Sequence, residues 1–139
     1  MNILVIDAQG GGIGKLLITA IKRDIPSAHI TAVGTNTSAT MNMMKAGADD
    51  AATGENPVIV ACRSADVIVG PAGIAIADSM LGEITPRMAL AIAQSQAKRI
   101  LIPFNQCNNI IVGIAKAGMA SLVQAAVDEI RRDDGNSIC

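Results

Sequence analysis

A glycine-rich loop near the start of the chain has the residue types of an anion-binding site. Four of the five positions before Lys15 are glycine: Gly10, Gly11, Gly12 and Gly14. Glycines between a strand and a helix let a ligand approach the backbone, and the free N–H groups of the first helical turn bind phosphate. The simpler alternative is a tight turn with close packing of the helix. We expect a phosphate-containing small molecule at positions 10–15, with Ile13 among its contacts.

Two phosphate-binding motifs fit this loop only in part. In the dinucleotide fingerprint G-x-G-x-x-G, a match that starts at Gly10 places its third glycine at Lys15. The P-loop motif G-x-x-x-x-G-K-[ST] matches at Gly14 and Lys15. It fails at Gln9, which replaces the first glycine, and at Leu16, which replaces the Mg²⁺-binding hydroxyl. Two explanations of Lys15 therefore stay open, a phosphate contact and a solvated lysine of the first helical turn.

Further polar side chains follow the predicted strands at their carboxyl ends. They are Asp7, Gln9, Thr35, Asn36, Asn105, Gln106 and Asn108, with Gly54, Glu55 and Asn56 in another loop. Amides and hydroxyls that converge at one edge of a sheet suit recognition of a base or a sugar. Each of these residue types is also common in ordinary turns, so the set predicts a site better than any single member does.

Asp7 ends a buried strand, where a carboxylate costs free energy unless it has partners. Three roles stay open for it: binding a ribose hydroxyl, holding a metal, or accepting N–H bonds from the glycine turn. Other reactive candidates are Cys107 and the acids Asp78 and Glu83. The two acids could form an acid–base pair, and the simpler alternative for them is solvation at the end of a helix. No His or Lys lies close to Cys107 in the sequence to activate it as a nucleophile.

Apolar patterning predicts the elements that position these residues. Apolar runs typical of buried strands occur at residues 3–6, 29–33, 67–69, 100–104 and 109–114, with a short strand near Ala51 and Ala52. Helical spacing or helix-start residues predict helices at residues 13–21, 74–81, 86–97 and 119–130. Residues 58–62 fit either a strand or a short buried helix, and we favour the helix. A further helix begins at Thr35 or Thr37 and runs through Met44.

Strands and helices alternate along the chain, which is typical of right-handed βαβ units and a parallel sheet covered on both faces. We therefore predict one Rossmann-like, doubly wound α/β domain of three layers, with a mainly parallel sheet of five or six strands. The domain spans residues 1–132, and residues 133–139 form a flexible tail. In such a sheet ligands bind where the winding reverses, and the glycine loop follows the strand at that point.

Two segments resemble the cofactor-binding part of the short-chain dehydrogenases/reductases. Gly12-Ile13-Gly14 is similar to the end of that family's glycine motif, with Ala8 at the position of the leading glycine. Residues 66–74 are similar to its fourth strand and N-N-A-G turn, with Gly70-Pro71 in place of the two asparagines. The resemblance implies an NAD(P)-type cofactor, bound by Gly10, Gly12, Ile13 and Gly14 with Pro71, Ala72 and Gly73 opposite.

The resemblance stops before catalysis, because that family uses a Tyr–Lys pair and this chain has no tyrosine. Ribose recognition also differs. NAD-binding sheets usually place an acid after the second strand, whereas Gly34-Thr35-Asn36-Thr37 stands here, without an Arg for a 2′-phosphate. We expect Thr35 and Asn36 to contact the ribose or base, and the ligand to be NAD(P) or another nucleotide.

Over its whole length the chain resembles a family of short uncharacterised bacterial proteins. The segments that carry the resemblance are DAQGGGIGK, GTN, ATGEN, GPAGI, SMLGEITP and PFNQCN. No activity comes with that family, so this resemblance supports a single domain and implies no chemistry.

Composition excludes several classes of partner. Net charge is −1, and the chain has one Phe with no Tyr or Trp, so neither a basic surface nor stacking platforms support nucleic-acid binding. No apolar stretch is long enough to cross a membrane.

The three cysteines lack metal-ligand spacing, so no metal is implied and we expect reduced thiols in the cytoplasm. Because only 17% of the residues are charged, we expect a homo-oligomer, in the simplest case a dimer.

Three functions stay open at this point. The chain binds or senses a nucleotide, it is a small enzyme that uses such a ligand, or it is a structural subunit with an empty site. The glycine loop favours the first two, which both need a bound ligand.

Overall fold

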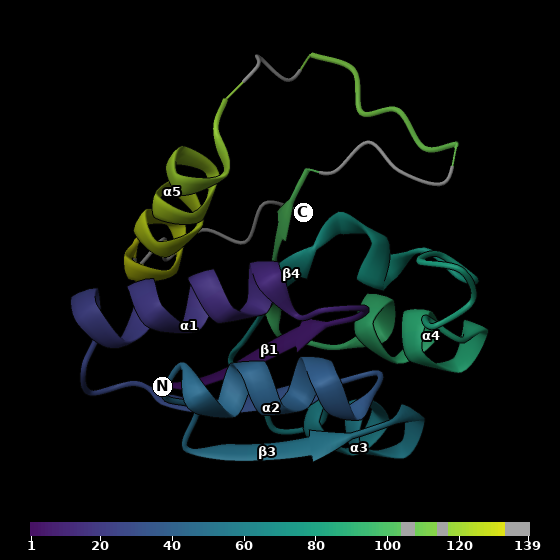
Figure 1. Ribbon diagram of the computed structural model, residues 1–139, viewed down its shortest axis with the longest axis horizontal. Helices are drawn as coiled ribbons and strands as arrows, with labels where there is room; N and C mark the ends of the chain where they lie inside the picture. The colour runs from purple at the N-terminus through teal and green to yellow at the C-terminus, as the bar shows by residue number, and fades with distance from the viewer. Residues whose placement is uncertain (104–107, 114–116, 133–139) are drawn as a thin grey trace.

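The computed structural model describes residues 1–103, 108–113 and 117–132, which contain a sheet of five parallel strands in the order β3-β2-β1-β4-β5 (Figure 1). The strands are β1 (Asn2–Asp7), β2 (His29–Gly34), β3 (Asp50–Thr53), β4 (Val67–Pro71) and β5 (Lys98–Ile102). The central strand β1 is buried at every residue after Asn2. Burial on both faces explains why its sequence is a continuous apolar run rather than an alternating one.

Helices cover both faces of the sheet and divide the core in two. They are α1 (Gly12–Asp24), α2 (Thr37–Lys45), α3 (Glu55–Ala61), α4 (Pro86–Gln94) and α5 (Met119–Arg131), with a short 3₁₀ helix η1 (Ala72–Ala75). Ile3 and Val5 of β1 pack with residues of α1, α2 and α5. Leu4 and Ile6 pack with residues of α3 and α4. The period of two along β1 thus assigns its side chains to opposite layers.

The winding reverses between β1 and β4. The chain adds β2 and β3 on one side of β1, then crosses over and adds β4 and β5 on the other side. The loops that follow β1 and β4 therefore lead in different directions from neighbouring strands, and a crevice opens at their carboxyl ends. The predicted doubly wound, Rossmann-like fold is confirmed, and the glycine loop lies at this reversal.

Two helix starts illustrate how local side chains set the boundaries. The α2 cap is Asn36, not Thr35 or Thr37 as expected, because the Asn36 side chain accepts the Ala39 N–H at 2.9 Å. Thr85 caps α4 as predicted and accepts the Met88 N–H, with proline at the first helical position. The α4 helix ends at Gln94, three residues before the predicted end.

Two predicted elements are wrong. Residues 74–81 do not form a helix; η1 ends at Ala75, and turns follow in which Asp78, Met80 and Leu81 have positive φ angles of 54–64°. A right-handed helix cannot contain such residues. Residues 109–113 of the predicted strand 109–114 form no ladder, and Ile110 and Val112 are 80% and 90% exposed. They run apart from the layered body (Figure 1), and none of the five described strands pairs with them.

Two further predictions cannot be compared with the structure, because they fall on residues outside the described part of the chain. Residue 104 of the predicted strand 100–104 and the predicted tail, residues 133–139, lie outside the described residues. Within the described part of the chain, none of the helices has the length and apolar character that crossing a membrane requires.

Candidate functional site

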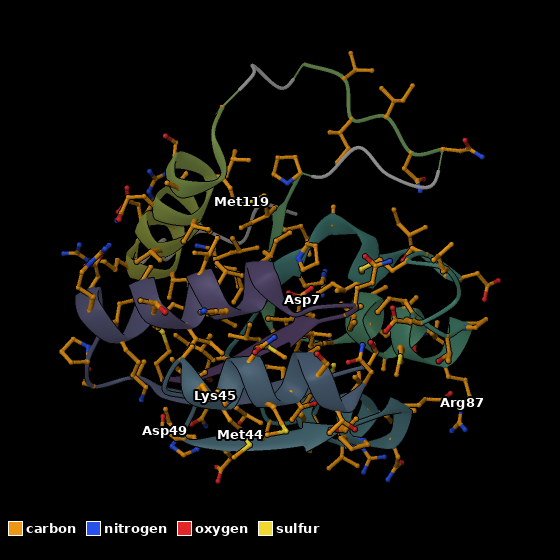
Figure 2. The ribbon with its side chains drawn as sticks, in the orientation of Figure 1. Asp7, Met44, Lys45, Asp49, Arg87 and Met119 are labelled. Atoms are coloured by element: carbon orange, nitrogen blue, oxygen red, sulfur yellow. The ribbon has the colours of Figure 1, made fainter. Side chains whose placement is uncertain are left out.

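Asp7 lies directly behind the glycine loop and binds its backbone. The residue is 4% exposed and lies at the carboxyl end of β1, beneath the start of α1 (Figure 2). Its Oδ1 accepts the Ala8 N–H at 2.8 Å, and its Oδ2 accepts the Gly14 N–H at 2.7 Å. Of the three roles that the sequence leaves open, this geometry matches the third, because Asp7 satisfies N–H groups that a helix start leaves free.

The environment of Asp7 shifts its pKa upward. Burial raises the pKa above the ordinary value of 3.8, while hydrogen bonds from the N–H groups of Gly14, Ala8 and Ile13 oppose that rise. The negative charge of Glu83 raises the pKa further.

Gly11 and Gly14 are required by the packing of α1 against α2. Gly11 has a φ of +69°, and a Cβ on it would lie 2.8 Å from the Cα of Ala39. A Cβ on Gly14 would lie 2.5 Å from the Sδ of Met43. These two glycines and Asp7 form what we term the inner side of the loop, and they fit the simpler explanation of a tight turn.

Gly10 and Gly12 have no such structural requirement. Both are exposed, neither has a positive φ, and a Cβ on either would have no heavy atom within 4 Å. Within residues 1–103, 108–113 and 117–132, no acceptor takes the N–H of Gly10 or Gly12. The Asn42 side chain holds the Gly10 carbonyl at 2.7 Å. We term Gly10 and Gly12 the outer side of the loop; it offers free N–H groups of the kind that bind phosphate.

A cavity of about 160 Å³ opens against the glycine loop. Residues 7–13 line it on one side, and Pro71 and Met80 line it on the β4 side. It therefore lies at the reversal of the winding, where ligands bind in this class of sheet. Small-molecule pockets usually measure about 300–1,000 Å³, so this cavity has room for a phosphate-sized group and not for a whole nucleotide.

Glu83 connects the loop after β4 to the loops after β1 and β2. Its Oε1 accepts three hydrogen bonds: from the Gln9 N–H at 3.2 Å, the Thr35 hydroxyl at 2.8 Å and the Asn36 side-chain amide at 2.7 Å. The Asn36 amide also donates to the Gln9 carbonyl at 2.9 Å. We term Gln9, Thr35, Asn36 and Glu83 the polar cluster; it gathers three of the predicted ligand-binding residues around an acid that the sequence suggested only as a partner of Asp78.

The polar cluster stabilises the charged form of Glu83. Partial burial alone would raise the pKa of Glu83, but the hydrogen bonds from Asn36, Thr35 and the Gln9 N–H outweigh it and lower the pKa below its usual value. Glu83 is therefore a carboxylate at neutral pH, with its geometry fixed by the neighbouring loops.

The remaining predicted contacts are less close to the cavity. Lys15 is exposed, and no ion pair of its side chain is found within the described residues. Ala72 and Gly73 begin η1 and do not line the cavity, although their neighbour Pro71 does. The Gly73 carbonyl instead accepts the Ser79 hydroxyl, which braces the loop after β4.

Several other candidates do not join this site. Asn105, Gln106 and Cys107 lie outside the described residues. Asp78 is exposed, and its N–H donates to the Ile84 carbonyl. The side chains of Asp78 and Glu83 form no hydrogen bond with each other, so the structure does not support the predicted acid–base pair. In the described part of the chain, no group of three or more His, Cys, Asp or Glu residues could hold a metal ion.

A larger hollow of about 530 Å³ lies between α3 and α4. Cys62, Arg63, Arg87 and Leu90 are among its lining residues, and Arg87 pairs with Glu55 at 3.2 Å at the rim of the molecule (Figure 2). Burial raises the pKa of the Cys62 thiol to about 11, which makes it a poor nucleophile. By volume alone this hollow would be the better candidate for the ligand site, but the free backbone donors and the polar cluster lie at the glycine loop.

Sequence reasoning missed the position of Glu83. The segment SMLGEITP marks an acid in a loop, but nothing in it indicates that the loop passes over β1 to reach the residues after β2. The signal that was available is the lack of an acid after the second strand, which leaves room for a carboxylate from elsewhere in the fold.

The chain belongs to the family described as Domain of unknown function (DUF3842), whose model matches residues 2–134. This confirms the expected membership in a family without assigned activity. The resemblance of the first half to the short-chain dehydrogenases/reductases stays a prediction. No curated protein is significantly similar to the chain in sequence.

Among solved structures, the chain is similar to a dodecameric FMN-dependent UbiX-like decarboxylase from Escherichia coli O157:H7. The two share 18% sequence identity with a TM-score of 0.48, over 94% of this chain and 76% of that one. At this level of similarity the match carries no inference about ligand or reaction.

Proposed function

We propose that the chain binds a nucleotide or dinucleotide, of the NAD(P) type or another kind, with a phosphate group on the N–H groups of Gly10 and Gly12. The observation that carries the proposal is the outer side of the loop. The N–H groups of the two exposed glycines there meet no acceptor among the described residues, and neither packing nor backbone conformation requires glycine at either position. A ligand that needs close access to the backbone supplies the missing reason.

The surrounding structure favours this mode of binding. Asp7 engages the Gly14 N–H from behind, so the ligand uses the donors of Gly10 and Gly12 and not those deeper in α1. The positive end of the α1 dipole points the same way. Lys15, exposed on the first turn, is long enough to add a charge to a phosphate held there.

The size of the cavity limits what it can hold. A volume of about 160 Å³ suits the phosphate alone, so we propose that the sugar and base extend along the sheet edge over Gln9, Thr35 and Asn36. In this arrangement Thr35 and Asn36 would contact the ribose or base.

The test is a thermal-shift panel with NAD(H), NADP(H), ATP, GTP, AMP, FMN and coenzyme A. A ligand at a hundred times its Kd adds about 2.7 kcal/mol of stability, which raises Tm by about 5 to 15 °C for a domain of this size. Gly12→Val should abolish that shift while the free protein unfolds as before, because its side chain enters open space.

Gly118→Val is the matched control. Gly118 also stands at a helix start, before α5, and a Cβ there meets nothing within 4 Å; its substitution should leave the ligand shift intact. If no nucleotide shifts the wild-type Tm, or if Gly12→Val shifts like the wild type, the proposal is wrong and the empty structural subunit becomes the better explanation.

Self-association is a separate proposal. Leu81, Leu90, Ile110 and Val112 are large apolar side chains with more than half of their surface exposed, which favours a homo-oligomer, in the simplest case a dimer. Sedimentation at micromolar concentration tests it, and a monomeric mass would remove it.

A further inference from the structure

The loop after β2 lacks the acid that usually binds a ribose in nucleotide-binding sheets. Gly34 ends β2, and Thr35 and Asn36 follow before α2 begins. Neither side chain carries the charge that makes a carboxylate a strong acceptor for hydroxyl groups.

Glu83 brings a carboxylate to this place from the other side of the reversal. It belongs to the loop between η1 and α4, yet its Oε1 lies 2.8 Å from the hydroxyl of Thr35, the first residue after β2. The Gln9 N–H fixes the same oxygen from the glycine loop. Three donors from two loops therefore hold the carboxylate beside the proposed phosphate site.

The second oxygen of Glu83 is available for a ligand. All three hydrogen bonds of the carboxylate end on Oε1, and no donor among the described residues reaches Oε2. Among the described residues that are not exposed, every buried side-chain oxygen or nitrogen has a hydrogen-bond partner. Glu83 is half-buried and its Oε2 has no partner there, so this oxygen is in contact with solvent. Oε2 thus combines a fixed position, solvent access and unused acceptor capacity.

We propose that Glu83 accepts the 2′- and 3′-hydroxyls of the ligand's ribose and makes the site specific for nucleotides with an unmodified ribose diol. The inference rests on the proposed function, since it assumes a phosphate at Gly10 and Gly12. A second consequence concerns cofactor choice. The carboxylate repels a 2′-phosphate, so the site prefers NAD to NADP and AMP to its 2′-phosphorylated form.

The experiment compares AMP with 2′,3′-dideoxy-AMP by isothermal titration calorimetry on the wild type, Glu83→Gln and Glu83→Ala. The wild type should bind AMP at least about tenfold more tightly than 2′,3′-dideoxy-AMP, as expected for hydrogen bonds to a charged acceptor. We term this factor the affinity ratio of the two ligands. In Glu83→Ala the ratio should fall to about one. Glu83→Gln, which keeps the length and one acceptor oxygen, should lie between them.

Asp78→Asn is the matched control, because Asp78 is an exposed acid of the same loop without a contact to the polar cluster. It should keep the full wild-type ratio. Each ratio is taken within one variant, so any loss of stability affects both ligands equally, and cooperative unfolding shows that each variant is folded.

The outcomes separate the two proposals. If the wild type binds neither AMP nor any nucleotide of the panel, the proposed function fails and this inference fails with it. If AMP binds but dideoxy-AMP binds equally well, or Glu83→Ala keeps the ratio, the role of Glu83 is wrong while the phosphate site stands. If Glu83→Ala binds both ligands more tightly, Glu83 blocks the site and does not bind the ribose.

Discussion

The inner and outer sides of the glycine loop differ in what their glycines do, although they are interleaved within five residues. On the inner side, a Cβ on Gly11 or Gly14 would lie less than 3.0 Å from atoms of α2, and Asp7 accepts the Gly14 N–H. On the outer side, Gly10 and Gly12 face open space with free N–H groups. A count of glycines cannot distinguish these two environments.

This difference shows why a glycine-rich loop is an ambiguous motif. The tight-turn explanation accounts for two of the four glycines and leaves the other two without a reason. The ligand explanation accounts for the remaining pair and says nothing about the first. Because each explanation makes its own pair sensitive to substitution, adding one Cβ at a time separates stability from binding.

The largest expected effect is on the inner side, at Gly11. Gly11→Ala forces a side chain into a left-handed backbone conformation and sets its Cβ 2.8 Å from the backbone of Ala39. We expect a loss of about 2–4 kcal/mol in the free energy of unfolding. Urea unfolding followed by circular dichroism measures it, since the chain has no Trp or Tyr for fluorescence. A loss below about 0.5 kcal/mol would contradict the close packing of α1 on α2.

A smaller effect is expected at Asp7, whose carboxylate satisfies the inner donors. Asp7→Ala leaves the buried N–H groups of Ala8 and Gly14 without their acceptor and should cost about 1–3 kcal/mol of stability. Asp7→Asn keeps one acceptor oxygen and should cost less. Asp78→Asn, at an exposed acid, is the control and should change stability by less than about 0.5 kcal/mol.

The pH dependence of that comparison has a defined sign. Because burial raises the pKa of Asp7, the part of its contribution to stability that depends on ionisation is fully present below the unfolded value near 3.8 and is lost as pH rises through the folded pKa. The stability of the wild type relative to Asp7→Asn should therefore fall as pH rises above about 3.8. Glu83, with its lowered pKa, acts in the opposite direction in both proteins. A relative stability that rises with pH would mean that the N–H bonds outweigh burial at Asp7.

The sequence predicts the core elements well because they depend on local patterns. The apolar run of β1 and the helical spacing of α1 and α5 each contain enough information to identify the element. The alternation of strands and helices predicts the parallel sheet with helices on both faces, whereas the order of the strands depends on which distant strands pair. Because the glycine loop directly follows β1, the sequence also predicts its place at the carboxyl edge of the sheet, where ligands bind in this fold.

The failures share a cause, which is dependence on distant contacts. Residues 109–113 are rich in strand-forming side chains, but a strand needs a neighbour, and none of the described strands pairs with this segment. The positive φ angles of Met80 and Leu81 follow from how the loop after β4 is anchored, with Met80 and Ile84 buried. The position of Glu83 depends on that same path, so no local pattern could reveal that it meets Thr35 and Asn36.

The smallest expected effect on stability is on the outer side of the loop, at Gly10. Gly10→Ala adds a Cβ that meets nothing within 4 Å, at a position without a positive φ. The free energy of unfolding should change by less than about 1 kcal/mol, with a tendency to increase, since alanine restricts the unfolded chain more than glycine does. Nucleotide binding in the calorimetric assay should weaken even so, because the added methyl group crowds the free N–H. If Gly10→Ala lost as much stability as Gly11→Ala, both sides of the loop would be structural, and the two glycines that carry the ligand proposal would need no ligand to explain them.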